Sequence, residues 1–167
     1  MPFSRLRSQS PWAESIILHL KAKEVFTYEY RPIVSQHKRL KTGTPSQVAR
    51  SYLGGKWRSY DVGFVYSSFE HDGLGRYGDP INPYGDLESM AKVSCLLKPG
   101  ALLFFGMPTA EDRVAWNAHR VYGRARIPLL FAAWDVVDVI GTVDLDRKTK
   151  ASEMGSQPVW VLKNTRP

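Results

Sequence analysis

The sequence predicts an α/β protein, built as a three-layer sandwich around a mostly parallel sheet. Two observations lead to this prediction. Short runs rich in β-branched and aromatic residues alternate with segments of helical periodicity, and residues 101–107 (ALLFFGM) are continuously apolar, which is typical of a strand covered on both faces. Strands that alternate with helices are joined by right-handed crossovers, so the strands lie side by side and parallel.

The first helix is predicted by a start signal and by its periodicity. Ser10 can cap a helix, and Pro11 suits the first helical position. Apolar residues then recur at i, i+3, i+4 and i+7, which predicts a buried stripe on one face. The stripe consists of Ala13, Ile16, Ile17 and Leu20.

The remaining elements follow from local pattern and from proline and glycine signals. In chain order, we expect a strand at 25–30, a short strand near 40–42, a helix at 45–53, a strand at 61–66, a helix at 85–97, a strand at 101–107, a helix near 110–120, and strands at 134–140 and 158–162. We expect these elements to form one domain over residues 1–167.

The composition limits the class of protein. The chain has 167 residues, of which 43% are hydrophobic and 23% are charged, a globular rather than a disordered composition. No apolar run approaches the roughly 20 residues that span a bilayer, and no leader opens the chain, so we expect a soluble, cytoplasmic protein. The single cysteine, Cys95, excludes a disulfide framework and a multi-cysteine metal site.

The net charge of +7 comes almost wholly from residues 1–60. The basic cluster at residues 37–41 (HKRLK) contains no aromatic residue, whereas nucleic-acid-binding surfaces usually interleave basic and aromatic side chains. We therefore expect no nucleic-acid partner. The cluster is interpreted as a solvated face, with an anionic partner as the alternative.

The loop at residues 67–83 (SSFEHDGLGRYGDPINP) is the first candidate site. Open parallel sheets bind ligands beyond the carboxyl ends of their strands, and loops of this length are usually functional or disordered. Its aromatic residues, glycines and mixed charges favour an ordered, functional loop. His71, flanked by Glu70 and Asp72, is a candidate general base, because a neighbouring carboxylate favours the protonated imidazole.

Two other interpretations of this loop stay open. The carboxylates of Glu70, Asp72 and Asp79 could bind a hard cation through oxygen. Alternatively, the carboxylates could cap the turns of the loop, while Arg76 pairs with one of them.

Glu29 is the second candidate, at the end of the strand expected at 25–30. Nucleotide-binding α/β proteins place an acid at this point, about twenty residues after the first turn, where one carboxylate accepts hydrogen bonds from both ribose hydroxyls. The alternative is an exposed glutamate at a strand end.

The third candidate site lies near the end of the helix expected at 110–120. Asn117, Arg120 and His119 could hydrogen-bond a polar substrate across the mouth of the sheet. In the alternative interpretation, His119 and Arg120 only complement the dipole of a helix C-terminus.

The residues of these three sites carry a resemblance to a known family. The sequence resembles domain of unknown function family two-six-eight, a Rossmann-like family, over about residues 8–140. The matching motifs are SQSPWAE at 8–14, YEY at 28–30, EHDGLGRYGDP and NPYGD within 67–86, LKPG at 97–100, WNAHRVY at 116–122 and WDVV at 134–137.

That family in turn resembles class I S-adenosylmethionine-dependent methyltransferases, which implies S-adenosylmethionine as the cofactor. On this template Glu29 would hold the cofactor ribose. The turn from Ser8 to Ser10 would face its methionine end, and the loop at Thr44 would approach its adenine.

The same resemblance implies transfer of a methyl group to a small polar acceptor, such as a sugar or glycan. His71, with Glu70 and Asp72, would lie near the transferred methyl group. Acceptor-binding residues would come from the loop and from the third site. They are Arg76, Asp79, Asn117, His119 and Arg120.

The chain departs from the methyltransferase pattern at its start. Such enzymes open with an apolar strand and a glycine-rich turn, which lets the backbone approach the cofactor. Here MPFSRLR precedes Ser8, and Arg7 stands where glycine is expected. We therefore predict a first strand that is short or missing, and keep as the alternative function a degenerate, non-catalytic Rossmann-like binding module.

Overall fold

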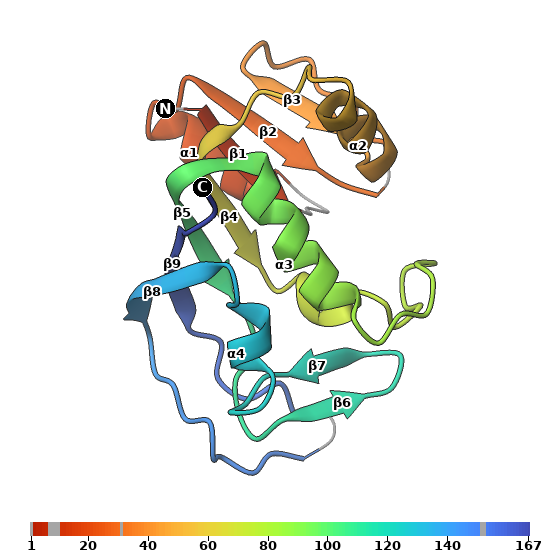
Figure 1. Cartoon of the computed structure of the whole chain (residues 1–167), viewed down its shortest axis with the longest axis vertical. Helices are drawn as coiled ribbons and strands as arrows, with labels where there is room; N and C mark the ends of the chain where they lie inside the picture. The colour runs from red at the N-terminus through yellow and green to blue at the C-terminus, as the bar shows by residue number, and fades with distance from the viewer. Residues whose placement is uncertain (1, 7–10, 31, 151–152) are drawn as a thin grey trace.

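A seven-stranded sheet forms the centre of the protein (Figure 1). The computed structural model describes residues 2–6, 11–30, 32–150 and 153–167. The strands stand in the order β3-β2-β1-β4-β5-β9-β8. They are β1 (Pro2–Leu6), β2 (Glu24–Tyr28), β3 (Leu40–Gly43), β4 (Tyr60–Tyr66), β5 (Leu97–Gly106), β8 (Trp134–Ile140) and β9 (Val159–Asn164).

Helices and one small hairpin complete the structure. The helices are α1 (Trp12–His19), α2 (Pro45–Leu53), α3 (Gly85–Leu96) and the short α4 (Ile127–Leu130), with one 3-10 turn, η1 (Phe69–His71). A separate two-stranded sheet consists of β6 (Arg113–Ala115) and β7 (His119–Val121). No helix among the described residues has the length and apolarity needed to cross a membrane.

The α/β class is confirmed, but the sheet is mixed. From β3 to β5 all neighbouring strands are parallel, whereas β9 is antiparallel to both β5 and β8. The first strand is short, as predicted, but it is not missing. β1 has five residues and pairs on one side with β2 and on the other with β4. Backbone pairing on both sides stabilises a strand here that side-chain pattern alone makes a poor candidate.

The helix expected at 110–120 is wrong, because these residues form the β6–β7 hairpin. The turn of the hairpin depends on Asn117, whose φ of 52° lies in the left-handed region that asparagine tolerates better than most residues. The N–H of Ala118 donates to the carbonyl of Ala115 at 2.9 Å and closes the turn. Asn117 therefore lies at a hairpin tip and not at a helix end.

The buried stripe expected on the first helix is also wrong. Ala13 is buried, but Ile16 and Leu20 are 52% and 73% exposed. Glu14 is buried beside Ala13, and its Oε1 accepts a hydrogen bond from Thr27 Oγ1 of β2 at 2.9 Å. α1 therefore docks on the sheet through a small side chain, a polar contact and the ring of Trp12, which packs against Phe64. Ile17 and Leu18 are only half-buried.

The main core reaches from the sheet into the loop that follows β4. Phe105 of β5 contacts both Phe69 of η1 and Phe131, and Phe131 contacts Trp160 of β9. Phe69 is 2% exposed. Because a core aromatic ring anchors η1, the polar residues next to it stand at a defined position.

Gly106 provides a test of how β4 and β5 pack. A Cβ on Gly106 would overlap the ring of Tyr66. We expect Gly106→Ala to lower the free energy of unfolding by about 1–3 kcal/mol, as measured by urea denaturation. In a Tyr66→Ala background the same substitution should cost clearly less, because the overlapping ring is gone. An equal cost in both backgrounds would contradict this account.

Candidate functional site

The loop 67–83 packs against the tip of the β6–β7 hairpin, and both lie on the same side of the molecule below α3 (Figure 1). His71 Nδ1 lies 2.5 Å from the carbonyl oxygen of Ala118. Arg76 Nη1 lies 3.5 Å from the carbonyl oxygen of Asn117. The structure thus brings the first and third predicted sites together.

Arg120 provides the buried part of the same junction. Its side chain is 2% exposed, and Nη1 donates to the carbonyl of Asp72 at 2.5 Å. Nη2 lies 3.4 Å from the carbonyls of Asn82 and of Pro83. The guanidinium therefore ties both ends of the long loop to β7.

Glu70 and His71 form the centre of the predicted catalytic group. Glu70 is fully buried, and its Oε1 accepts a hydrogen bond from Ser67 Oγ at 2.6 Å. His71 Nε2 lies 3.5 Å from the same oxygen. Because Ala118 O lies at Nδ1, that nitrogen carries the proton, and Nε2 is the nitrogen that can take up or release one.

Ser67 turns the chain out of β4 into this group. Its φ of 46° lies in the left-handed region, which is uncommon for a residue other than glycine and is often found at functional sites. The N–H of Ser67 still donates to the carbonyl of Gly106 at 2.9 Å. The turn is thus held by β5 while the Ser67 side chain contacts Glu70.

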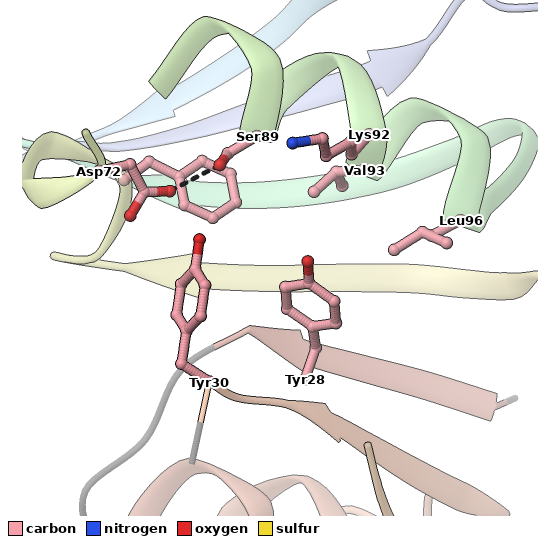
Figure 2. Close-up of a pocket in the computed structure, with 8 residues that line it drawn as sticks. Tyr28, Tyr30, Asp72, Ser89, Lys92, Val93 and Leu96 are labelled. Carbon is pink, nitrogen blue, oxygen red and sulfur yellow. Dashed lines mark hydrogen bonds between the residues drawn. The ribbon is translucent and has the colours of Figure 1, made fainter. Parts of the chain in front are cut away.

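Asp72 lies between the loop and α3. Ser89 Oγ donates to Asp72 Oδ2 at 2.6 Å, and Asp72 is 3% exposed. Figure 2 shows Tyr28 and Tyr30 with their hydroxyl groups directed toward α3 and Asp72. These residues line one cavity of about 10 Å³, about the size that holds a single water.

This cavity shows where the second predicted site lies. Tyr28 and Tyr30 flank Glu29, while Phe69 and Asp72 flank Glu70 and His71, and all four line the same cavity. The end of β2 and the turn after β4 therefore meet at the carboxyl edge of the sheet. Glu29, Glu70 and His71 do not themselves line the cavity, so the convergence of the Glu29 and Glu70 carboxylates on one cleft stays a prediction.

The residues predicted to bind the cofactor have different surroundings. Glu29 follows β2 directly, and its Oε1 accepts the N–H of Tyr30 at 2.8 Å. Thr44 is the N-cap of α2, and its N–H donates to Gln47 Oε1 at 2.8 Å. Ser8 and Ser10 lie outside the described residues.

Asp79 is held inside its own loop. Its carboxylate accepts the N–H groups of Gly73, Gly75 and Tyr77 at 2.7, 3.3 and 3.2 Å. Burial alone would raise the pKa of Asp79, but the donated backbone N–H groups lower it below the ordinary value. Asp79 is therefore the charged centre of a loop turn.

The cation site considered for Glu70, Asp72 and Asp79 has no geometric support. In the part of the chain that the structure describes, no three or more His, Cys, Asp or Glu residues are grouped so that they could hold a metal ion. The three carboxylates instead bond to separate partners, which are Ser67, Ser89 and the backbone of the loop.

His119 lies on β7 behind the junction and is 8% exposed. Its pKa is lowered by burial, and also by the nearby His71 and the guanidinium of Arg113. The lowered pKa favours the neutral form of His119, which lies close to the more exposed imidazole of His71.

Asp86, in the first turn of α3, is a residue of this region that was not predicted from the sequence. It is fully buried, and its carboxylate accepts hydrogen bonds from Arg126 Nε at 2.8 Å and Nη2 at 2.5 Å. Arg120 Nε lies 3.7 Å from Asp86 Oδ1. The buried Tyr122 has a raised pKa, because of its burial and then the charge of Asp86. Asp86 belongs to the NPYGD motif, and this motif is the feature of the sequence from which its role could have been predicted.

A larger cavity of about 600 Å³ lies elsewhere, between α1, β2, β3 and residues 33–37. Its volume is in the range of small-molecule sites. None of Glu70, His71 or Asp72 lines it. Its lining residues are Pro11, Glu14, Ser15, Leu18, Thr27, Ile33, Val34, Ser35, Gln36, His37, Leu40 and Thr42.

The fold of this chain is similar to that of solved methyltransferases, and its structural neighbours are class I S-adenosylmethionine-dependent methyltransferases. One is 1,6-didemethyltoxoflavin-N1-methyltransferase of Burkholderia thailandensis, with a TM-score of 0.66 and 11% identity over 99% of this chain and 71% of that one. Another is the N-methyltransferase NodS of Bradyrhizobium japonicum WM9, with a TM-score of 0.61 and 14% identity over 99% and 78%. Both were solved with S-adenosylhomocysteine.

The chain belongs to the family described as Caenorhabditis protein of unknown function, DUF268, whose sequence pattern matches residues 5–160. No curated protein sequence is significantly similar to it. At these identities the solved structures establish the fold, and they leave the substrate to be determined.

Asp86 provides a test of how the site is held. We expect Asp86→Asn to lower the free energy of unfolding by about 3–5 kcal/mol, because it leaves two arginines of a buried cluster without their counter-charge. The control is Asp146→Asn, which breaks the exposed pair with Arg124 and should change stability little. Urea denaturation measures both, and equal effects would refute a structural role for the buried cluster.

Proposed function

We propose that this protein is an S-adenosylmethionine-dependent methyltransferase that acts on a small polar acceptor, such as a sugar or glycan hydroxyl. The observation that carries the proposal is the convergence of the Tyr28–Tyr30 segment and the turn at Glu70 on one cavity at the carboxyl edge of the sheet. The methyltransferase fold of the structural neighbours supports it, and the three-layer arrangement of such enzymes is part of the proposal.

The donor set at this edge fits the proposed cofactor. Glu29 presents a carboxylate at the end of β2, where it can accept hydrogen bonds from ribose hydroxyls. Thr44, at the start of α2, would approach the adenine. Ser8 and Ser10 would complete the site at the methionine end. When bound, S-adenosylmethionine supplies a methyl group that is already activated by its sulfonium.

His71 is the proposed general base. Nε2 of His71 would take up the proton of the acceptor hydroxyl as the hydroxyl oxygen accepts the methyl group that S-adenosylmethionine would supply. Glu70 Oε1, 3.5 Å from Nε2, would stabilise the imidazolium that results. Asp72, held by Ser89, would fix the position of the turn.

The remaining predicted residues divide by their contacts. Arg76, Asn117 and His119 lie at or behind the junction of loop and hairpin, and we assign them to the acceptor side. The side chains of Arg120 and Asp79 already bond to the backbone of the loop, so in this proposal they act as positioning residues.

Cofactor binding is the first test. We expect S-adenosylhomocysteine to raise the melting temperature of the protein, and calorimetry to show binding that is about tenfold or more weaker in Glu29→Gln, because a charged acceptor is lost. The control Glu111→Gln removes an exposed carboxylate away from the site. The absence of any shift at millimolar ligand would favour the non-catalytic module.

Methyl transfer is the second test. The protein is incubated with S-adenosylmethionine that carries a labelled methyl group and with a panel of free monosaccharides and sugar phosphates. With any acceptor that is methylated, His71→Gln should lower the rate about 10²–10⁴-fold and leave S-adenosylhomocysteine binding intact. The control His37→Gln changes an exposed histidine. Wild-type rates in His71→Gln would rule out His71 as the base.

A further inference from the structure

The basic residues of the first third of the chain gather at one edge of the sheet, opposite the predicted catalytic turn. Three loops lead into β2, β3 and β4, at residues 20–23, 37–39 and 54–59. Because these strands run parallel in one sheet, with β1 between β2 and β4, their amino ends share one edge. The turn at Glu70 follows the carboxyl end of β4 and therefore lies at the other edge.

Backbone and side-chain contacts join these loops into one surface. Arg39 Nη1 donates to the carbonyl of Ala22 at 2.9 Å, and the carbonyl of Arg39 accepts the N–H of Val25 at 2.8 Å. Tyr60 Oη donates to Glu24 Oε1 at 3.2 Å, which joins the start of β4 to the start of β2. We call this surface the basic edge.

The basic edge carries a strong positive charge. Two neighbouring acids are already engaged, since Glu24 bonds to Tyr60 and Asp61 pairs with Lys98 at 2.5 Å. The exposed cations of the basic edge are Lys21, Lys23, Lys38, Arg39, Lys41, Lys56 and Arg58.

Two exposed leucines stand beside these cations. Leu20 ends α1 and is 73% exposed, and Leu53 ends α2 and is 85% exposed. Both helices connect parallel strands, so both run back from the carboxyl edge and end at the amino edge. Each leucine therefore projects next to a basic loop, where its side chain gains nothing from packing in the isolated chain.

We propose that the basic edge docks on a membrane surface rich in anionic phospholipid. Lysine and arginine at such a surface are attracted by the lipid charge, and apolar side chains beside them can enter the boundary between headgroups and acyl chains. A nucleic-acid surface would offer aromatic side chains among the cations. The aromatic residue of these loops, Trp57, instead packs inward against Phe26 and Tyr60.

This placement leaves the predicted catalytic turn accessible. β4 has seven residues, which separates the two edges by roughly 20 Å. A molecule seated on its basic edge would hold the opposite edge away from the bilayer and toward water. The inference goes beyond the proposed function and stands even if that function fails.

Vesicle flotation tests the proposal. We expect the full chain to float with vesicles of phosphatidylcholine that contain about a third phosphatidylserine, and not with vesicles of phosphatidylcholine alone. Raising the salt from about 0.1 to 0.5 M should release most of the protein, because exposed charges are screened. Equal binding to both vesicles, or to neither, would overturn the proposal.

Charge reversal identifies the surface. Lys38→Glu with Lys56→Glu should weaken binding to the anionic vesicles at least about tenfold. Lys148→Glu with Lys150→Glu makes the same change in net charge on exposed residues of the segment between β8 and β9, which lies at the bottom of Figure 1 while β2 and β3 lie at the top. Equal losses in the two double variants would show that only net charge matters and would refute a localised surface.

The leucines separate a membrane from other anionic partners. Leu20→Ser with Leu53→Ser should weaken vesicle binding several-fold, whereas Leu129→Ser with Val137→Ser, at comparably exposed positions, should not. Competition with single-stranded RNA tests a nucleic acid as the alternative partner. The membrane proposal is wrong, and the partner is a nucleic acid, if vesicles do not bind while RNA binds tightly at about 0.1 M salt. In that case Leu20→Ser with Leu53→Ser would leave RNA binding unchanged.

Discussion

The buried carboxylate of Asp86 contacts the guanidinium groups of Arg120 and Arg126 and so joins α3 to the β6–β7 hairpin and to the start of α4. Burying these charges costs free energy that their mutual attraction only partly offsets. We therefore interpret the cluster as fixing the position of the hairpin relative to α3 more than as adding stability. Arg120 comes from the hairpin and also donates to the carbonyl of Asp72. The position of the predicted catalytic turn at residues 69–71 therefore depends on a contact made by an acid of α3.

The position of β1 sets the width of the candidate site. β1 separates β2 from β4, and neighbouring strands lie about 4.8 Å apart, so the ends of β2 and β4 are about 10 Å apart. A single small molecule can contact both ends across that distance. Tyr28 is the last residue of β2, and Asp72 lies in the turn that follows β4; both line the same cavity. β1, although it has only five residues, therefore sets the distance between the ends of β2 and β4.

Local signals made α2 predictable over residues 45–53, because Pro45 and Gly54 mark its ends in the sequence itself. The β6–β7 hairpin was not predictable in this way, since its turn depends on the left-handed backbone of Asn117 and on docking against a distant loop. Periodicity on α1 showed which residues share a face, but not which face the sheet would cover. The partners of Asp86 are some 40 residues away in sequence, beyond the reach of any local pattern.

The lysines and arginines of the basic edge lie at the opposite edge of the sheet from the proposed methyl-transfer site. This placement affects how that site would bind its cofactor. S-adenosylmethionine carries a positive sulfonium, so a cluster of lysines next to its site would oppose binding. The cations of the basic edge lie roughly 20 Å from the carboxyl edge, about two Debye lengths at 0.1 M salt, so their field is largely screened there. Lys92 of α3, which lines the cavity at the carboxyl edge, is paired with Glu88. In the proposed function, the carboxylates of Glu70 and Glu29 would then act on a cationic ligand without opposition from the basic edge, which would attract an anionic surface.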